Sequence, residues 1–268
     1  MKLEIKEVGK SFQKDGKITE VLKPTSIEID KGTFVSVVGP SGCGKSTLFN
    51  IIAGLTRPSS GDVLVDGVSI LNRNGQVGYM LQKDLLLPWR TIIQNIILGL
   101  EIKGITKKVA IAQAMPLLER YGLKGFENHF PNELSGGMRQ RAALLRTFLF
   151  DADIMLLDEP FAALDAQTKG QMQSWLLRMW ADVEKTIMFV THDIDEALFL
   201  SDTVYVLSAR PGSIKAVLSV DLERPRSRDV LLTNEFLDMK RTLYNLLAQE
   251  EKEEDRGDGD EPEDNGGR

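Results

Sequence analysis

The residues from Gly39 to Thr47 constrain this chain more than any other part of it. They read Gly-Pro-Ser-Gly-Cys-Gly-Lys-Ser-Thr, and they lie between a β-rich apolar run, Phe34 to Val38, and an apolar helical pattern, Leu48 to Leu55. A glycine-rich loop in this position turns its backbone N–H groups around an anion, and the following helix N-terminus favours the same negative charge. The segment therefore predicts a site for nucleotide phosphates in a layered α/β fold.

We expect every residue of this loop to lie against the nucleotide. These residues are Gly39, Pro40, Ser41, Gly42, Cys43, Gly44, Lys45, Ser46 and Thr47. Lys45 is expected to contact the β- and γ-phosphates as a mobile cation, and the Ser46 hydroxyl to bind Mg²⁺. Cys43 occupies a position where side chains vary, so we interpret it as tolerated and not catalytic. A glycine-rich turn with an accidental Lys-Ser is the alternative, but the flanking strand and helix argue against it.

A second site follows another buried run, Ile154 to Leu157, which ends in Asp158 and Glu159. Strand alternation predicts that these two carboxylates point in opposite directions and have different roles. We expect Asp158 to hold Mg²⁺ through water and Glu159 to act as the general base on the attacking water. A solvated acidic strand end is the alternative for a single carboxylate.

His192 follows the β-rich run Ile187 to Val190, so it is expected at a carboxyl end of the same sheet, where ligands bind in such folds. A lone histidine is usually structural, but beside the other two sites we favour a contact with the γ-phosphate. The other histidine, His129, precedes Pro131 in a loop and receives no role.

The order of patterns along the chain predicts strands and helices in alternation, with a helical insertion. Residues 86–150 show helical patterns without a convincing strand, and Pro116 predicts a kink or break in one of these helices. A helical stripe that we expect to be core follows the acidic site. Its members are Met172, Trp175, Leu176, Met179, Trp180 and Val183.

The net charge of −6 belongs to the end of the chain. Residues 250–268 contain ten acids and three bases, a balance of −7, which leaves about +1 for the rest. This balance predicts no nucleic-acid partner for the folded part, because such proteins usually show a basic face. The acidic, glycine-rich residues 250–268 are expected to be disordered. One cysteine excludes an internal disulfide, and no apolar run approaches the ~18 residues that span a bilayer.

A further motif, Leu134-Ser135-Gly136-Gly137-Met138, resembles the signature of the ABC transporter ATPases. A serine and two glycines at a helix start form an exposed anion-binding nest, and this one is expected far from the phosphate loop of its own chain. Two copies would therefore pack head to tail. Each ATP would lie between one phosphate loop and Ser135, Gly136 and Gly137 of the other copy.

Other residues also match this family. Gln82 resembles the glutamine that ligates Mg²⁺ and senses the membrane subunit, and Asp165 lies in a segment similar to the D-loop. His192 resembles the switch histidine. Phe12 is similar to the aromatic residue that stacks on adenine, although a phenylalanine there could equally belong to the core.

The resemblance implies a P-loop NTPase core with an antiparallel β subdomain. Expected boundaries are residues 1–85 and 151–225 for this core, 86–150 for the helical signature subdomain, 226–249 for a helical extension and 250–268 for the disordered tail.

Four segments resemble the nitrate, sulfonate and taurine importer ATPases: Leu87 to Thr91, Leu164 to Thr168, Thr191 to Ala197 and Ser208 to Gly212. The resemblance implies an ATPase that uses ATP and Mg²⁺ as a homodimer, peripheral at the cytoplasmic side of the inner membrane. Its implied partners are a membrane permease, which would contact the region from Leu86 to Trp89, and an extracytoplasmic solute-binding protein. An exporter or lipid-trafficking ATPase and a non-transport ATPase of this family are the alternatives.

Overall fold

The structure is a computed structural model that describes residues 1–257 apart from 72, 74 and 184; residues 258–268 also lie outside the described part. Within the described residues, six strands form one sheet in the order β10-β9-β3-β8-β7-β6. They are β3 (Phe34–Val38), β6 (Gly78–Met80), β7 (Ile154–Asp158), β8 (Thr186–Val190), β9 (Thr203–Leu207) and β10 (Ile214–Ser219). All neighbours are parallel except β10, which runs antiparallel to β9.

The parallel pairing decides where the site lies. Every residue of β3, β7 and β8 is buried, as expected of strands covered on both faces. Because parallel strands end at the same edge of a sheet, the segments that follow β3, β7 and β8 meet there. The predicted phosphate loop, acidic pair and His192 are these segments.

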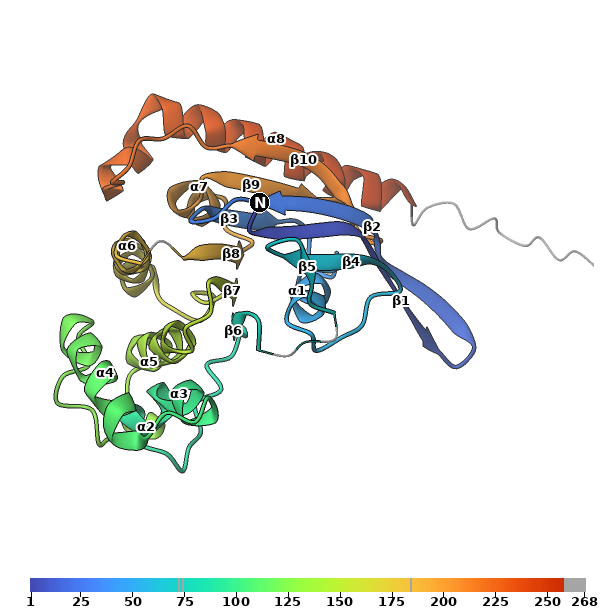
Figure 1. Cartoon of the computed structure of the whole chain (residues 1–268). Helices are drawn as coiled ribbons and strands as arrows, with labels where there is room; N and C mark the ends of the chain where they lie inside the picture. Colours follow the sequence, from blue (N-terminus) through green and yellow to red (C-terminus); the bar gives the residue numbers. More distant parts are fainter. Residues whose placement is uncertain (72, 74, 184, 258–268) are drawn as a thin grey trace, which may run out of the picture.

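A second sheet packs beside the first (Figure 1). In the part of the chain that the structure describes, it has the order β2-β1-β4-β5. Its strands are β1 (Leu3–Lys14), β2 (Lys17–Ile29), β4 (Ser60–Val65) and β5 (Val68–Ser69). The helix α1 (Lys45–Ile52) shares a single apolar cluster with residues of both sheets, including Phe49, Ile5 and Val37. This cluster fixes α1, and with it the phosphate loop, between the two sheets.

Residues 86–150 form helices without a strand, as the sequence predicts. The elements are α2 (Ile92–Ile96), α3 (Leu98–Ile102), α4 (Lys107–Arg120), the 3₁₀ turn η1 (Pro131–Glu133) and α5 (Gly136–Leu149). They lie at the β6 side of the central sheet (Figure 1). Of the kink or break predicted at Pro116, the break does not occur: α4 continues through this residue. Ala110, Ala114 and Leu118 form a buried stripe along α4, and this packing offsets the cost of about 3 kcal/mol of an internal proline.

The remaining helices are α6 (Ala166–Ala181), α7 (Ile194–Leu200), the 3₁₀ turn η2 (Arg228–Leu232) and α8 (Asn234–Gly257). Two of them pack near the inner strand β3, where Trp180 of α6 contacts Phe34 and α7 contacts β3. The stripe predicted on α6 packs inward, with Met172, Leu176 and Met179 fully buried. The helix α8 packs on α7 through Phe236 and Leu243, which are also buried (Figure 1). It continues into the segment for which the sequence predicts disorder; residues 258–268 of that segment lie outside the described residues.

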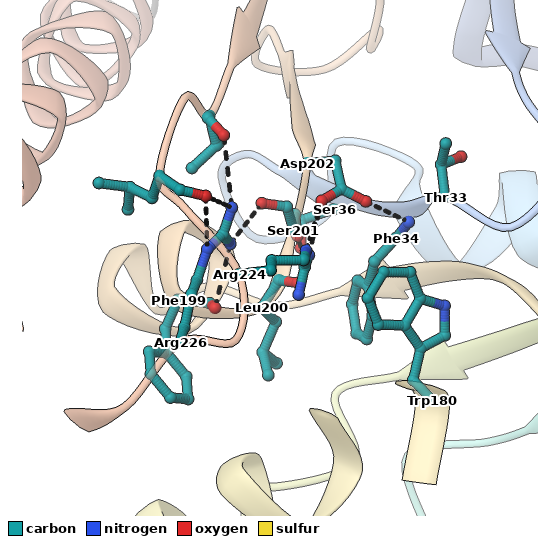
Figure 2. Close-up of polar contacts among 12 residues, drawn as sticks. Thr33, Phe34, Ser36, Trp180, Phe199, Leu200, Ser201, Asp202, Arg224 and Arg226 are labelled. Carbon is teal, nitrogen blue, oxygen red and sulfur yellow. Dashed lines mark hydrogen bonds and ion pairs between the residues drawn. The ribbon is translucent and has the colours of Figure 1, made fainter. Parts of the chain in front are cut away.

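A buried arginine fastens this C-terminal part to the core (Figure 2). Arg226 Nη1 donates to the carbonyl oxygens of Leu198, Phe199 and Ser201, at 3.0, 3.1 and 2.7 Å. These carbonyls belong to the end of α7, where a helix leaves acceptors without intrahelical donors. Burial, and then the nearby Arg224, lower the pKa of Arg226 to about 10, so the guanidinium remains charged at neutral pH.

Among the described residues, no helix has both the length and the apolar character that a membrane crossing requires.

Candidate nucleotide-binding site

The glycine-rich loop connects β3 to α1, as the sequence predicts. Gly44 precedes the helix with a φ of 105°, in the left-handed region that favours glycine. A Cβ atom at this residue would also lie 3.1 Å from the carbonyl oxygen of Val21. The backbone turn that starts α1 therefore depends on a glycine at this position.

The Lys45 ammonium group lies inside this loop. Its Nζ donates to the carbonyl oxygens of Gly39 and Pro40, both at 2.7 Å, and the side chain is buried. The buried Cys43 Sγ lies 3.7 Å from the same Nζ. Burial raises the pKa of the Cys43 thiol, and the Lys45 ammonium opposes this effect only in part, so the thiol stays protonated at neutral pH.

A cavity of about 410 Å³ opens beside the loop. Its lining residues are Phe12, Val21, Ser41, Gly42, Gly44, Lys45, Ser46, Thr47, Glu159 and Arg210. Phe12 is 45% exposed and lies in the wall of this cavity, which excludes the alternative that it belongs to the core. Lys10 Nζ lies 4.8 Å from the centre of the Phe12 ring.

Two lining residues, Val21 and Arg210, are not among the site residues predicted from the sequence. The loop after β9 brings Arg210 to the cavity, because Gly212 N donates to the carbonyl oxygen of Val21 at 3.0 Å. The same glycine accepts from the backbone N–H of Lys23 at 2.8 Å. A signal existed for Arg210, since it follows the apolar run Val204 to Leu207, now β9 of the parallel sheet, and so lies at the ligand-binding edge. Val21 lies inside the long strand β2 and carries no such signal.

Asp158, the last residue of β7, is 5% exposed. Tyr79 donates its hydroxyl to Asp158 Oδ2 at 3.4 Å. Burial raises the pKa of Asp158, while hydrogen bonds with Ser46 and Tyr79 oppose the shift. No ion pair to this carboxylate occurs within the described residues, so it is a buried acid without a direct cationic partner.

Glu159 follows the strand with a φ of 45°, and its N–H donates to the carbonyl oxygen of Val190 at 2.9 Å. The expected strand alternation is therefore wrong for this residue, because β7 ends at Asp158 and a left-handed residue follows. A non-glycine residue in this region carries strain that the surrounding structure must offset. Glu159 Oε2 accepts from Gln82 Nε2 at 3.1 Å and lies 3.3 Å from His192 Nδ1. Three of the predicted site residues thus meet at one carboxylate oxygen.

The serine and glycines of the predicted second nest lie at the N-terminus of α5. Ser135 is the N-cap and accepts from the backbone N–H of Met138 at 3.4 Å, and Gly136 is exposed. Asp165 is the N-cap of α6 and accepts from the N–H groups of Gln167 and Thr168. None of Ser135, Gly136 and Gly137 lines the cavity of the phosphate loop.

The two helix starts lie against each other. A Cβ atom at Gly137 would lie 2.8 Å from Thr168 Cγ2, so only a glycine leaves room for that side chain.

The described residues contain no group of three or more histidines, cysteines or acids that could hold a metal ion. Any metal at this site would depend on hydroxyl, amide and phosphate oxygens as well as on Asp158.

The fold and the site together define a class. A phosphate loop on β3, with an acidic strand end on β7 and β8 between them, is the arrangement of a P-loop nucleoside triphosphatase. Comparisons with known proteins narrow this class. Residues 22–162 match the family model described as ABC transporter. The chain therefore belongs to the ABC transporter family, as an ATP-binding and ATP-hydrolysing member.

Several relatives cover most of this chain. An uncharacterised ABC transporter ATP-binding protein, MJ0412 of Methanocaldococcus jannaschii, is 46% identical over 93% of this chain and 92% of its own length. The aliphatic sulfonates import ATP-binding protein SsuB of Bacillus cereus is 42% identical over 85% of this chain and 90% of its own. The taurine import ATP-binding protein TauB of Yersinia pestis is 44% identical over 75% and 78%.

A solved structure is similar throughout its own length. The ATP-binding cassette MJ0796, in a dimeric post-hydrolysis state bound to ADP and Pi, has a TM-score of 0.73 and 30% identity. The similarity covers 82% of this chain and 100% of that cassette.

Proposed function

We propose that this chain is the ATPase of an importer for a small oxyanionic solute, of the sulfonate, taurine or nitrate type. The shared carboxylate oxygen of Glu159 carries the catalytic part of this proposal, because it joins Gln82 and His192 at the cavity that contains Lys45. The relatives named for sulfonate and taurine import, 42% and 44% identical, support the choice of solute class.

The cavity suggests how ATP binds. Phe12 would stack on the adenine at one end, and the loop amides with Lys45 would hold the β- and γ-phosphates at the other. Arg210 adds a second positive side chain to the same wall. Glu159 would polarise the attacking water, and His192 would donate to the γ-phosphate.

Mg²⁺ fits the residues that are present. Ser46, Gln82 and Asp158 supply the oxygen ligands that this ion prefers, and a divalent cation would compensate the buried Asp158 carboxylate. When bound, Mg²⁺ neutralises charge that develops on the transferred phosphoryl group. Asp158 would orient its water ligands, and the Tyr79 hydroxyl would in turn orient Asp158.

A second copy of the chain would complete the site. Ser135, Gly136 and Gly137 lie outside the cavity of their own chain, and Gly136 is exposed at the N-terminus of α5. In a head-to-tail dimer this nest would bind the γ-phosphate held by the other copy. Asp165, which caps α6 next to this nest, would then lie at the same interface.

The permease would contact the helical segment. In the predicted region from Leu86 to Trp89, Trp89 is 71% exposed, whereas Leu86 is buried. The adjoining Leu85 is 50% exposed, and such exposure is unusual for large apolar side chains. A membrane subunit that covers them would bring the ATPase to the cytoplasmic face of the cell membrane. An extracytoplasmic solute-binding protein would deliver the solute to that subunit.

Growth of a deletion strain tests this function. Aliphatic sulfonate or taurine serves as the only sulfur source in one set, and nitrate as the only nitrogen source in another. We expect a defect on one source that the wild-type gene rescues and the Lys45→Ala variant does not. Normal growth on every source would overturn the proposed solute class. ATP hydrolysis by the purified chain is the matching biochemical control, because it tests the ATPase without the solute.

A further inference from the structure

His192 lies in a short connection whose position depends on its neighbour Thr191. Thr191 is 2% exposed, and its hydroxyl donates to Glu196 Oε2 on α7 while accepting from the N–H of Asp193 at 3.0 Å. Because Thr191 and Asp193 flank His192, the hydroxyl of Thr191 holds the backbone on both sides of it. Glu196, together with the backbone contact of Thr191 N with the carbonyl oxygen of Val37 at 3.4 Å, therefore holds this connection.

Glu196 is itself held from α6. The side chain is 3% exposed, and its Oε1 accepts from Gln173 Nε2 at 3.1 Å. The same Oε1 lies 3.0 Å from Lys169 Nζ, which also pairs with Asp193 at 2.8 Å. A buried carboxylate with this many donors is confined to one position, since any other would leave polar groups unpaired.

The next member of this chain of contacts belongs to the C-terminal part of the protein. Arg228, the first residue of η2, donates from Nη1 to Gln173 Oε1 at 3.2 Å. Its guanidinium lies against α6 at Gly170, where a Cβ atom would be 2.2 Å from Arg228 Nη1. Gly170 thus leaves the space that this contact requires.

The amide of Gln173 makes one hydrogen bond to each neighbour, and its two ends are not interchangeable. Its carbonyl faces Arg228, which can only donate, and its NH₂ group faces the Glu196 carboxylate, which can only accept. Loss of Arg228 removes the donor to the Gln173 carbonyl, so of these two contacts only the hydrogen bond to Glu196 still holds the amide. The Gln173 side chain is then held at one end instead of two, so its hydrogen bond confines the buried Glu196 carboxylate less firmly.

We propose that Arg228 is a positioning residue for His192, acting through Gln173, Glu196 and Thr191. The C-terminal segment is then part of the catalytic geometry, and it reaches the site without touching the nucleotide. This inference rests on the proposed contact of His192 with the γ-phosphate. Contacts joined end to end from Arg228 to Thr191 carry it, and each of them is a direct hydrogen bond.

Steady-state ATPase measurements on the full chain test how much Arg228 contributes to the rate of hydrolysis. For Arg228→Ala we expect kcat to fall roughly two- to tenfold with an unchanged KM for ATP, which corresponds to one lost hydrogen bond. Arg228→Lys keeps a donor toward Gln173 and is expected to recover part of the rate. Arg178→Ala is the matched control, because Arg178 lines a cavity together with Arg228 and its side chain makes no ion pair or hydrogen bond in the described part of the chain. It is expected to leave kcat unchanged.

A double-mutant cycle asks whether the effect passes through His192. Single-turnover rates in the His192→Ala background should no longer respond to Arg228→Ala, because the residue being positioned is absent. An equal loss in both backgrounds would overturn the proposal. A wild-type rate for His192→Ala alone would instead refute the proposed role of His192, so the two failures are distinguishable.

Histidine NMR tests the position directly. The chain contains two histidines, and His129 serves as an internal reference far from α6 in sequence. We expect Arg228→Ala to move the imidazole signals of His192 and not those of His129, while Arg178→Ala moves neither. Unmoved His192 signals would overturn the inference. If Arg228→Ala fails to fold, Arg228→Met retains the apolar stem over Gly170 and permits the same measurements.

Discussion

His192 Nδ1 and Glu159 Oε2 lie 3.3 Å apart, across the carboxyl ends of the neighbouring strands β8 and β7. The same oxygen accepts from Gln82 at 3.1 Å, so groups from two separate loops meet at one carboxylate. The position of the Glu159 carboxylate therefore depends on both loops. Movement of Gln82 or His192 toward another partner would release Glu159 to act on water.

The first prediction concerns Glu159. Replacement by Gln removes the carboxylate while keeping its size, and ATP hydrolysis should fall by about 10²- to 10⁴-fold, the usual contribution of a general base. ATP binding should persist, because Lys45 and the loop hold the phosphates. Phosphate release measures the first effect, and size-exclusion chromatography with ATP detects the closed dimer that should accumulate. A variant that hydrolyses ATP at the wild-type rate would show that another group is the base.

A second prediction concerns Arg210, which sequence reasoning missed. Arg210→Ala should weaken ATP binding about tenfold, because a hydrogen bond to a charged group contributes ~1.5 kcal/mol or more. Isothermal titration calorimetry of the Glu159→Gln background measures this affinity without hydrolysis. Arg241→Ala, on the exposed face of α8, is the control and should leave the affinity unchanged. An unchanged affinity for the Arg210 variant would place its side chain outside the nucleotide contacts.

The third prediction concerns stability. Arg226→Ala should lower the free energy of unfolding by about 3 kcal/mol, because it leaves buried carbonyl groups at the end of α7 unpaired. Arg224 lies two residues earlier, is partly exposed and pairs with Asp202 at 2.7 Å, so Arg224→Ala should cost less. Urea unfolding followed by circular dichroism compares the two variants. Equal midpoints would mean that the Arg226 contacts contribute little.

The fourth prediction follows from Asp158. Burial raises the pKa of this carboxyl in the folded state above its unfolded value, so folding favours the protonated form. The stability is therefore greatest below the unfolded pKa, and it falls as pH rises through the interval up to the folded pKa. Above that interval, in buffer without Mg²⁺ and nucleotide, Asp158→Asn should unfold at a higher temperature than the wild type.

The same substitution should abolish Mg²⁺-dependent hydrolysis. Differential scanning calorimetry as a function of pH checks the stability difference, with Asp15→Asn in an exposed turn as a control outside the site. A wild type that is more stable than Asp158→Asn at neutral pH would contradict the assigned direction of the pKa shift.

Much of this site could be predicted because its parts are local. The phosphate loop follows a strand and starts a helix, and the residues after β7 and β8 stand at the same edge for the same reason. The likeness to ABC ATPases rested on motifs of a few residues, and the family comparison confirmed it. The role of Phe12 could not be predicted in this way, because a sequence pattern does not distinguish a buried aromatic residue from one in a cavity wall.

Other features depended on contacts between distant residues. Strand alternation does not extend to Glu159, because β7 ends at Asp158 and Glu159 has a left-handed backbone. Of the kink or break expected at Pro116, the break does not occur, because packing of α4 outweighs a local preference. The contact of Gly212 with β2 helps to place the loop that brings Arg210 to the cavity.

The sequence by itself determined the class of fold, the phosphate loop and the strand ends that carry Asp158 and His192, because periodicity and backbone preference act over a few residues. Only the tertiary structure decided which groups hold Glu159 and how Arg228 is connected to Thr191 through Gln173. Those contacts join residues far apart in the chain. They exist because the packing of α6, α7 and η2 brings buried polar groups together, where each must find a partner.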